Sequence, residues 1–169
     1  FFFRNVSRNK KSIVLDLKQA KGRAVFLRLV ESADVVVEGF RPGVMARLGL
    51  DYAQLSEHNP QLVLCSISGY GQEGPYAQCA GHDINYLGYT GVLDQTGTVG
   101  GAPALCNLQI ADLLGGTLSA VNAILLGLLD ARSSGRGRHV DVAMCDTVLQ
   151  HMVFPLAQLQ AGGTVAPRG

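Results

Sequence analysis

Two side chains that can transfer protons stand out in the chain. His82 lies in the glycine-containing segment AGHDINY, and Asp112 follows later in the segment QIAD. An imidazole group changes its charge near neutral pH, so it can accept or donate a proton under physiological conditions. Asp112 is predicted in the first turn of a long apolar helix, where the helix dipole and the unpaired backbone N–H groups favour a carboxylate. If the two side chains meet, they could act as the acid and the base of a proton-transferring site.

Each of these residues also has a plainer interpretation. A single histidine in a glycine-rich loop is more often a surface or hydrogen-bonded residue, and an aspartate at a helix start often only caps the helix. Asp83 could orient the backbone or the imidazole of its neighbour, although adjacent side chains in an extended segment point apart. The residues alone leave these alternatives open.

Composition and motifs exclude several other classes of protein. The 169 residues are 47% hydrophobic and 16% charged, which suits one globular domain, and the formal charge of +1 gives no field that would attract nucleic acid. The chain contains no G-x-S-x-G segment of the hydrolase type, and the glycines of residues 97–101 lack the spacing of phosphate-binding loops. Any anionic ligand must therefore be held by a local group of basic residues.

The four cysteines follow no metal-binding or redox pattern. Cys65, Cys79, Cys106 and Cys145 form no C-x-x-C pair. We therefore expect reduced thiols in the protein core, no metal site, and a reducing compartment. That compartment is the cytoplasm, or in a eukaryote the peroxisome or the mitochondrion.

The first half of the chain alternates β-branched runs with helical patterns. The predicted strands are residues 12–17, 33–38 and 62–68, and the predicted helices are residues 19–31 and 51–57. Strands and helices in this order indicate right-handed crossovers and a parallel sheet, which makes the chain an α/β protein. Such open sheets bind ligands beyond the carboxyl ends of their strands, here at residues 17–18, 39–41 and 69–75.

The second half is dominated by one apolar helix, predicted from Leu108 to about Arg132. Its apolar part is barely long enough to cross a membrane and contains glycine and asparagine, so we expect a helix buried in the protein rather than a membrane span. The glycines would let another segment approach closely. A last strand is predicted over residues 139–144.

Three segments, SIVLDLK, EGFRPGVMARLG and AGHDINYLGYTG, resemble the family III CoA-transferases, and most closely the racemase branch of that family. The resemblance implies a Rossmann-like large domain, a smaller domain, and an interlocked homodimer. The chain would be an internal piece of the large domain, truncated at both ends. Residues 1–80 would be the βαβ part of its CoA-binding region, and residues 81–169 the catalytic loop, the long buried helix and a linking segment.

The resemblance also implies roles for individual residues. His82 and Asp112 match the catalytic positions, and a coenzyme A thioester would be the substrate, with no prosthetic group. A catalytic glutamate that pairs with the histidine in the racemases would lie beyond Gly169. The positions that match the family's CoA-contacting segments are Leu15, Lys18, Gly39, Phe40, Arg41, Arg47, Ala80, Gly81 and Asp83.

Three functions are consistent with these residues. The first is racemisation of 2-methylacyl-CoA thioesters, in which an enolate forms and a proton returns to the opposite face of the same carbon. The second is transfer of CoA between carboxylic acids, in which Asp112 forms an acyl anhydride. The third is CoA binding or dimerisation without catalysis. The histidine in GHDINY is typical of the racemases and favours the first function.

Overall fold

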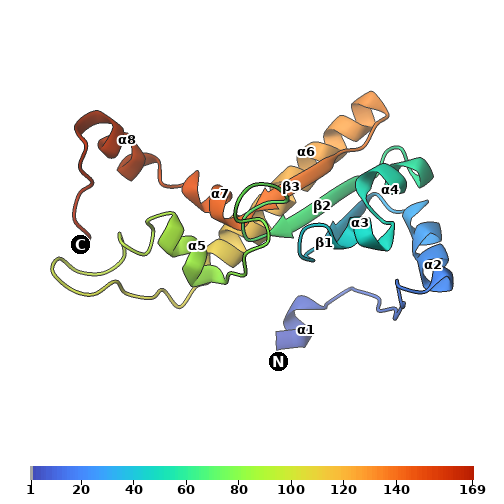
Figure 1. Cartoon of the computed structure of the whole chain (residues 1–169), viewed down its shortest axis with the longest axis horizontal. Helices are drawn as coiled ribbons and strands as arrows, with labels where there is room; N and C mark the ends of the chain where they lie inside the picture. Colours follow the sequence, from blue (N-terminus) through green and yellow to red (C-terminus); the bar gives the residue numbers. More distant parts are fainter. Residues whose placement is uncertain (1) are drawn as a thin grey trace.

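A three-stranded parallel sheet forms the centre of the computed structural model, which describes residues 2–169 (Figure 1). Its strands β1 (Val35–Glu38), β2 (Val63–Ser68) and β3 (His139–Ala143) lie in the order β1-β2-β3. The strand β3 comes from the far end of the sequence and pairs with β2, with Ser66 opposite Asp141. The predicted parallel sheet and the predicted strands 33–38, 62–68 and 139–144 are confirmed.

The predicted strand over residues 12–17 is wrong. Residues 11–16 belong to no helix or strand, and the Val14 side chain is 94% exposed. A β-branched sequence favours extended backbone, but a strand also needs a hydrogen-bonded neighbour. In the part of the chain that the structure describes, β1 pairs only with β2, so this segment has no such neighbour.

Three helices pack with β1 and β2 into the main hydrophobic core. They are α2 (Ala20–Val30), α3 (Val44–Leu48) and α4 (Tyr52–His58), and a short helix α1 (Phe2–Val6) precedes them. The fully buried side chains of Leu50, Leu55 and Leu62 lie at the centre of this core. Asp51 begins α4, and its carboxylate accepts a hydrogen bond of 3.1 Å from the backbone N–H of Gln54. The predicted helices 19–31 and 51–57 are thus present.

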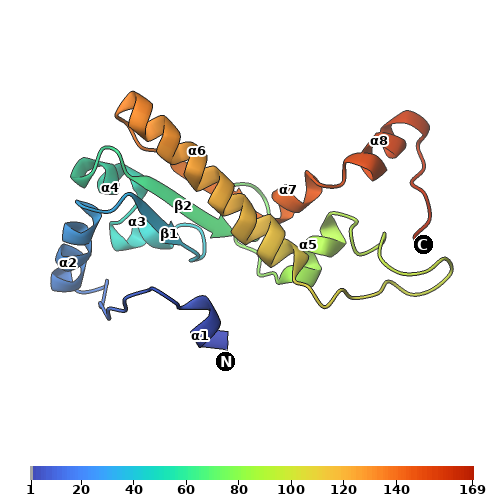
Figure 2. The ribbon, with the colours of Figure 1, turned by 180° about the vertical axis from the view of Figure 1, so that it is seen from behind.

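The long apolar helix crosses the other face of the sheet (Figure 2). It starts with wide π-type turns in η1 (Ile110–Leu118) and continues as α6 (Ser119–Ser134). Its small residues face the sheet and the helix α7 (Met144–Leu149). A Cβ atom on Gly115 would lie 2.9 Å from the Met144 carbonyl oxygen, and one on Gly127 would lie 3.1 Å from Val63. As expected, the glycines allow this close approach.

The leucines of the same helix face outward, so the expectation of a buried helix is wrong for this chain. Leu118, Leu125, Leu126 and Leu129 are all exposed, Leu126 at 68%. The reason is that the opposite side of the helix, with Ala120, Ile124 and Gly127, contacts the sheet. The 25-residue helix Ile110–Ser134 is long and apolar enough to cross a membrane by length and composition, a property shared by core helices of soluble proteins.

The remaining helices lie beyond the carboxyl end of the sheet. They are α5 (Asp83–Tyr89), α7 (Met144–Leu149) and α8 (Val153–Gly162). Tyr86, Leu87, Ala111 and Val148 form a second, smaller core between α5, η1 and α7. This core holds the start of α5 against the start of η1. His82 lies at the first of these helix starts and Asp112 at the second.

The cysteines only partly follow the expectation of core thiols. All four are unpaired. Cys65 is buried, and its burial together with the charges of Glu38 and Asp141 raises its pKa to about 11. Cys79 and Cys106 are exposed, so the prediction is wrong for them. Both lie in irregular segments that no helix or strand covers.

Candidate active site

His82 and Asp112 lie at the starts of two neighbouring helices and line the same cavity. His82 is the residue that precedes α5, and its backbone N–H donates a hydrogen bond of 2.9 Å to the Asn85 side chain. Asp83 follows as the first residue of α5, and its carboxylate accepts a hydrogen bond of 2.9 Å from the backbone N–H of Asp112. This bond joins the two segments that the sequence analysis selected.

The environment of Asp112 makes its carboxyl hold a proton more tightly than usual. Burial raises the pKa of Asp112, the negative charge of Asp83 raises it further, and His82 acts in the opposite direction. A carboxyl group whose pKa moves toward neutral pH is better matched to proton transfer than one that is always ionised. Asp112 therefore has the electrostatic character expected of a general base or acid.

A cavity of about 280 Å³ opens in front of these three residues. His82, Asp83 and Asp112 provide its titratable groups at one end, and Thr96 and Gln109 add polar side chains. Most of the remaining wall is apolar, with the side chains of Ile84, Leu87, Leu93, Leu105, Leu108 and Ile110. The proton-transfer groups thus face a space that suits an uncharged, apolar group, and we call it the apolar cavity.

A second cavity, of about 330 Å³, lies at the carboxyl ends of β1 and β2. It also includes His82, so this residue lines both spaces. We call it the strand-end cavity. Its wall includes six of the residues that the sequence analysis selected, namely Gly39, Phe40, Arg41, Ala80, Gly81 and His82. Its position agrees with the general rule that open α/β sheets bind ligands beyond their strand ends.

Tyr86 separates the strand-end cavity from the protein core, and the sequence analysis missed it. Its side chain is only 4% exposed. A Cβ atom on Gly69 would lie 2.5 Å from its hydroxyl oxygen, and one on Gly81 would lie 2.6 Å from its ring. Only glycine leaves room for the ring at both positions. The glycine directly before His82 was the one signal in the sequence that a bulky group approaches there.

Three selected residues lie outside both cavities. Leu15 and Lys18 belong to the segment before α2, where the backbone N–H of Lys18 donates to the Asp16 carboxylate at 3.0 Å. Arg47 lies on α3, and its guanidinium would be 3.2 Å from a Cβ atom placed on Gly43. These three residues are not brought to the walls of either cavity, and their contact with CoA stays a prediction.

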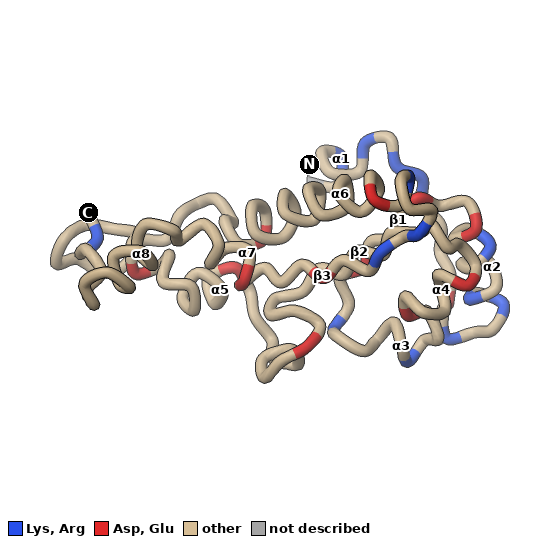
Figure 3. The backbone as a smooth tube through the Cα atoms, turned by 90° about the horizontal axis from the view of Figure 1, so that it is seen from above, with Lys and Arg blue, Asp and Glu red and all other residues tan. Residues whose placement is uncertain are grey.

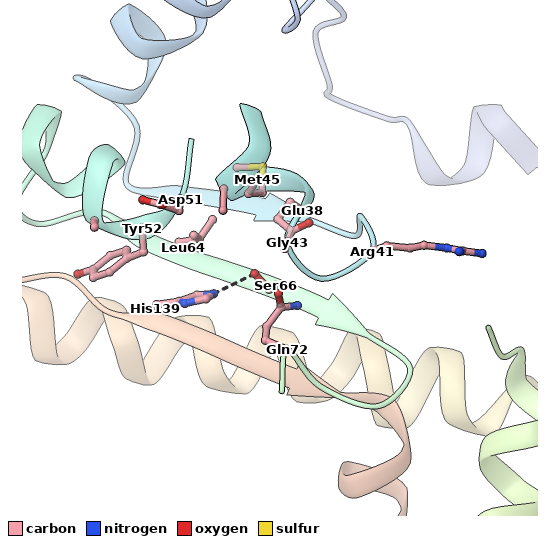
Figure 4. A pocket seen from close by; sticks show the side chains of 12 residues that line it. Glu38, Arg41, Gly43, Met45, Asp51, Tyr52, Leu64, Ser66, Gln72 and His139 are labelled. Carbon is pink, nitrogen blue, oxygen red and sulfur yellow. Dashed lines mark hydrogen bonds between the residues drawn. The ribbon is translucent and has the colours of Figure 1, made fainter. Parts of the chain in front are cut away.

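A third cavity, of about 270 Å³, lies on the sheet beneath α3 and α4 (Figure 4). Within it the Ser66 hydroxyl and His139 Nε2 form a hydrogen bond of 2.9 Å, and Tyr52 stacks on the His139 ring. The buried Glu38 accepts a hydrogen bond of 2.8 Å from the backbone N–H of Phe40. This bond fixes the turn after β1, which holds part of the strand-end cavity.

Basic residues gather at one end of the molecule (Figure 3). Ten of the 14 lysines and arginines lie within residues 1–50, which include α2, β1 and α3. Arg41 is the one at the strand-end cavity, and it also lies at the edge of the third cavity (Figure 4). Among residues 2–169, no group of three or more His, Cys, Asp or Glu side chains could hold a metal ion.

Comparison with known proteins identifies the family to which the chain belongs. Residues 1–169 match the family described as CoA-transferase family III. The chain is 43% identical over 145 residues to a succinate–glutarate CoA-transferase of Agrobacterium fabrum, covering 86% of the chain and 36% of that protein. It is 41% identical over 164 residues to the alpha-methylacyl-CoA racemase of Homo sapiens, covering 97% of the chain and 43% of that protein.

A solved structure has the same fold. The crystal structure of a CAIB/BAIF family protein from Brucella suis superposes with a TM-score of 0.88 at 38% identity, over 94% of the chain and 42% of that protein. The chain therefore spans about two fifths of the length of these relatives. Both a racemase and a transferase stand among them.

Proposed function

Because the chain belongs to CoA-transferase family III, we propose that the protein of which it is a part racemises 2-methylacyl-CoA thioesters. The observation that carries this proposal is the arrangement of His82 and Asp112 at one cavity, with Asp112 held by Asp83. Racemisation needs a base on one face of the α-carbon and an acid on the other. An imidazole and a carboxyl with a raised pKa supply these two groups.

The proposed reaction proceeds in two proton transfers. Asp112 or His82 removes the α-proton of the thioester, which gives an enolate, and the other residue returns a proton to the opposite face. The enolate oxygen needs a hydrogen-bond donor. The backbone N–H groups of Asp112 and His82 already donate to the side chains of Asp83 and Asn85, which favours the N–H group of Gly81 for this role.

The two cavities suggest how the substrate lies. We propose that the pantetheine arm of CoA occupies the strand-end cavity and the acyl group the apolar cavity, which places the thioester near His82 because this residue lines both. Arg41 could then hold a phosphate with two parallel N–H bonds, as guanidinium groups do.

Transfer of CoA between carboxylic acids is the second candidate. The similarity to the succinate–glutarate CoA-transferase favours this reaction, because that similarity is as strong as the similarity to the racemase. In that reaction the Asp112 carboxylate would attack the acyl carbonyl, the C–S bond would break, and the CoA thiolate would leave as the acyl-aspartyl anhydride forms. Hydroxylamine would trap this intermediate as a hydroxamate on Asp112, and a racemase would give no such product.

We further propose that the whole enzyme is a homodimer in a reducing compartment such as the cytoplasm, the peroxisome or the mitochondrion. The exposed leucines of α6 support an assembly that covers them, and the four unpaired cysteines support the compartment. Sedimentation of the full-length protein tests the assembly directly.

Exchange of the α-proton tests the proposed function. The full-length protein is incubated in D2O with each enantiomer of a 2-methylacyl-CoA, and the deuterium content and configuration are followed by mass spectrometry and chiral separation. Uptake from both enantiomers with interconversion supports racemisation. No uptake, together with hydroxamate formation in the presence of a carboxylic acid acceptor, would support transfer instead.

A further inference from the structure

Asp83 belongs with the proton-transfer pair rather than with the CoA-binding residues. The sequence analysis expected it to contact CoA, but the strand-end cavity does not include it. Its carboxylate instead accepts the partly buried 2.9 Å hydrogen bond from the Asp112 backbone and lines the apolar cavity beside the Asp112 side chain. The bond ties the first residue of α5 to the first turn of η1.

The charges around Asp112 also single out Asp83. Burial raises the pKa of Asp112 most, and of the charged neighbours Asp83 raises it and His82 lowers it. The elements packed against η1 also carry titratable groups, which are Cys145 and Asp146 on α7, His139 and Asp141 on β3, Asp130 and Arg132 on α6, and Tyr86 and Tyr89 on α5. None of these is among the causes of the shift at Asp112.

We propose that Asp83 is a positioning residue, which anchors the backbone of Asp112 opposite His82 and places a second negative charge beside it. The proposal rests on the role of Asp112 in proton transfer given above. Asp83 does not exchange a proton with the substrate. Its hydrogen bond fixes the position of the Asp112 backbone at the start of η1. Its charge affects how readily the Asp112 carboxyl gives up its proton.

Two substitutions separate these effects. In Asp83→Asn the amide oxygen can still accept the bond from the Asp112 backbone, but the charge is lost. Loss of the charge lowers the pKa of Asp112, so the acid limb of log kcat/KM moves to lower pH for the enantiomer that Asp112 deprotonates. In Asp83→Ala the anchor is lost as well, and kcat falls by about tenfold or more, because small displacements of a reacting group are costly.

Asp51→Asn is a matched control. Asp51 also accepts a hydrogen bond from a backbone N–H at a helix start, at 3.1 Å from Gln54, but it does not line the apolar cavity. The pH profile of this variant should superpose on that of the wild type. If the profile of Asp83→Asn also superposes on the wild type, or differs only by a uniform loss of activity, Asp83 has a merely structural role and the proposal is wrong.

Titration of Asp112 itself keeps this test independent of the reaction. In full-length protein with ¹³C-labelled aspartate carboxyls, the Asp112 signal is assigned with Asp112→Asn and followed against pH by NMR. The account predicts a lower midpoint in Asp83→Asn than in the wild type, and an unchanged midpoint would overturn it. Absence of α-proton exchange in the wild type would instead contradict the proposed racemisation and leave this result standing.

Discussion

The two ends of the sheet are built from different kinds of contact. Around α2, α3 and α4, fully buried leucines such as Leu50, Leu55 and Leu62 pack against β1 and β2. Around α5 and η1, a small core supports a histidine and two carboxylates that face an open cavity. The first region stabilises the fold, whereas the second holds Asp112 in an environment that disfavours its charged form. Substitutions in the two regions should therefore affect different properties.

Asp112→Asn gives the largest expected effect, on activity alone. Turnover should fall by about 10³-fold or more, since general acid–base groups contribute factors of this size. Because the pKa of Asp112 is raised in the folded protein, its contribution to stability is present at acid pH and lost as the pH rises through that value. The neutral amide avoids this loss, so thermal unfolding at pH 7 should occur at an equal or higher temperature. Activity within tenfold of the wild type would contradict the assignment.

Leu55→Ala should have the converse effect. Removing this fully buried side chain should lower the free energy of unfolding by about 2–5 kcal/mol. The pH dependence of kcat/KM should not change at temperatures where the variant stays folded. Val14→Ala is the control, because Val14 is almost fully exposed and should alter stability by less than about 0.5 kcal/mol. Urea titration measures both variants, and a shifted pH profile in Leu55→Ala would show that the two regions are coupled.

Arg41→Ala should have the smallest effect of the three and act on substrate binding. Loss of a charge-assisted bond to a CoA phosphate should raise KM by about tenfold while kcat changes little. Arg47→Ala tests the geometry, because Arg47 does not line the strand-end cavity. Its effect on KM should be the smaller one. A larger effect for Arg47 would mean that the phosphates bind along α3 rather than at the strand ends.

Local patterns predicted most of the scaffold. The apolar runs at residues 33–38, 62–68 and 139–144 form strands because each has a parallel neighbour to pair with, and β2 lies between the other two. The run at residues 12–17 has the same composition and fails, since pairing depends on a partner that composition does not reveal. Likewise, a periodic pattern showed the long helix but could not show that its glycines rather than its leucines face the sheet.

The sequence pointed to candidate site residues but not to the contacts between them. His82 and Asp112 were selected by their chemistry, and the structure places them at one cavity. The hydrogen bond between Asp83 and the Asp112 backbone joins segments that are distant in sequence. The Tyr86 side chain likewise packs against Gly69, which lies in another loop, as well as against Gly81. Such contacts depend on the packing of α5 against η1 and β2, which no local pattern encodes.

The central claim is that His82 and Asp112 serve opposite faces of the same carbon. The most direct measurement is α-proton exchange in D2O with each enantiomer separately, in full-length His82→Ala and Asp112→Asn. The account predicts that neither variant interconverts the enantiomers, that each still exchanges the proton of one enantiomer, and that the two variants retain exchange with opposite enantiomers. Loss of exchange with the same enantiomer in both variants would contradict it, because the two residues would then act on a single face.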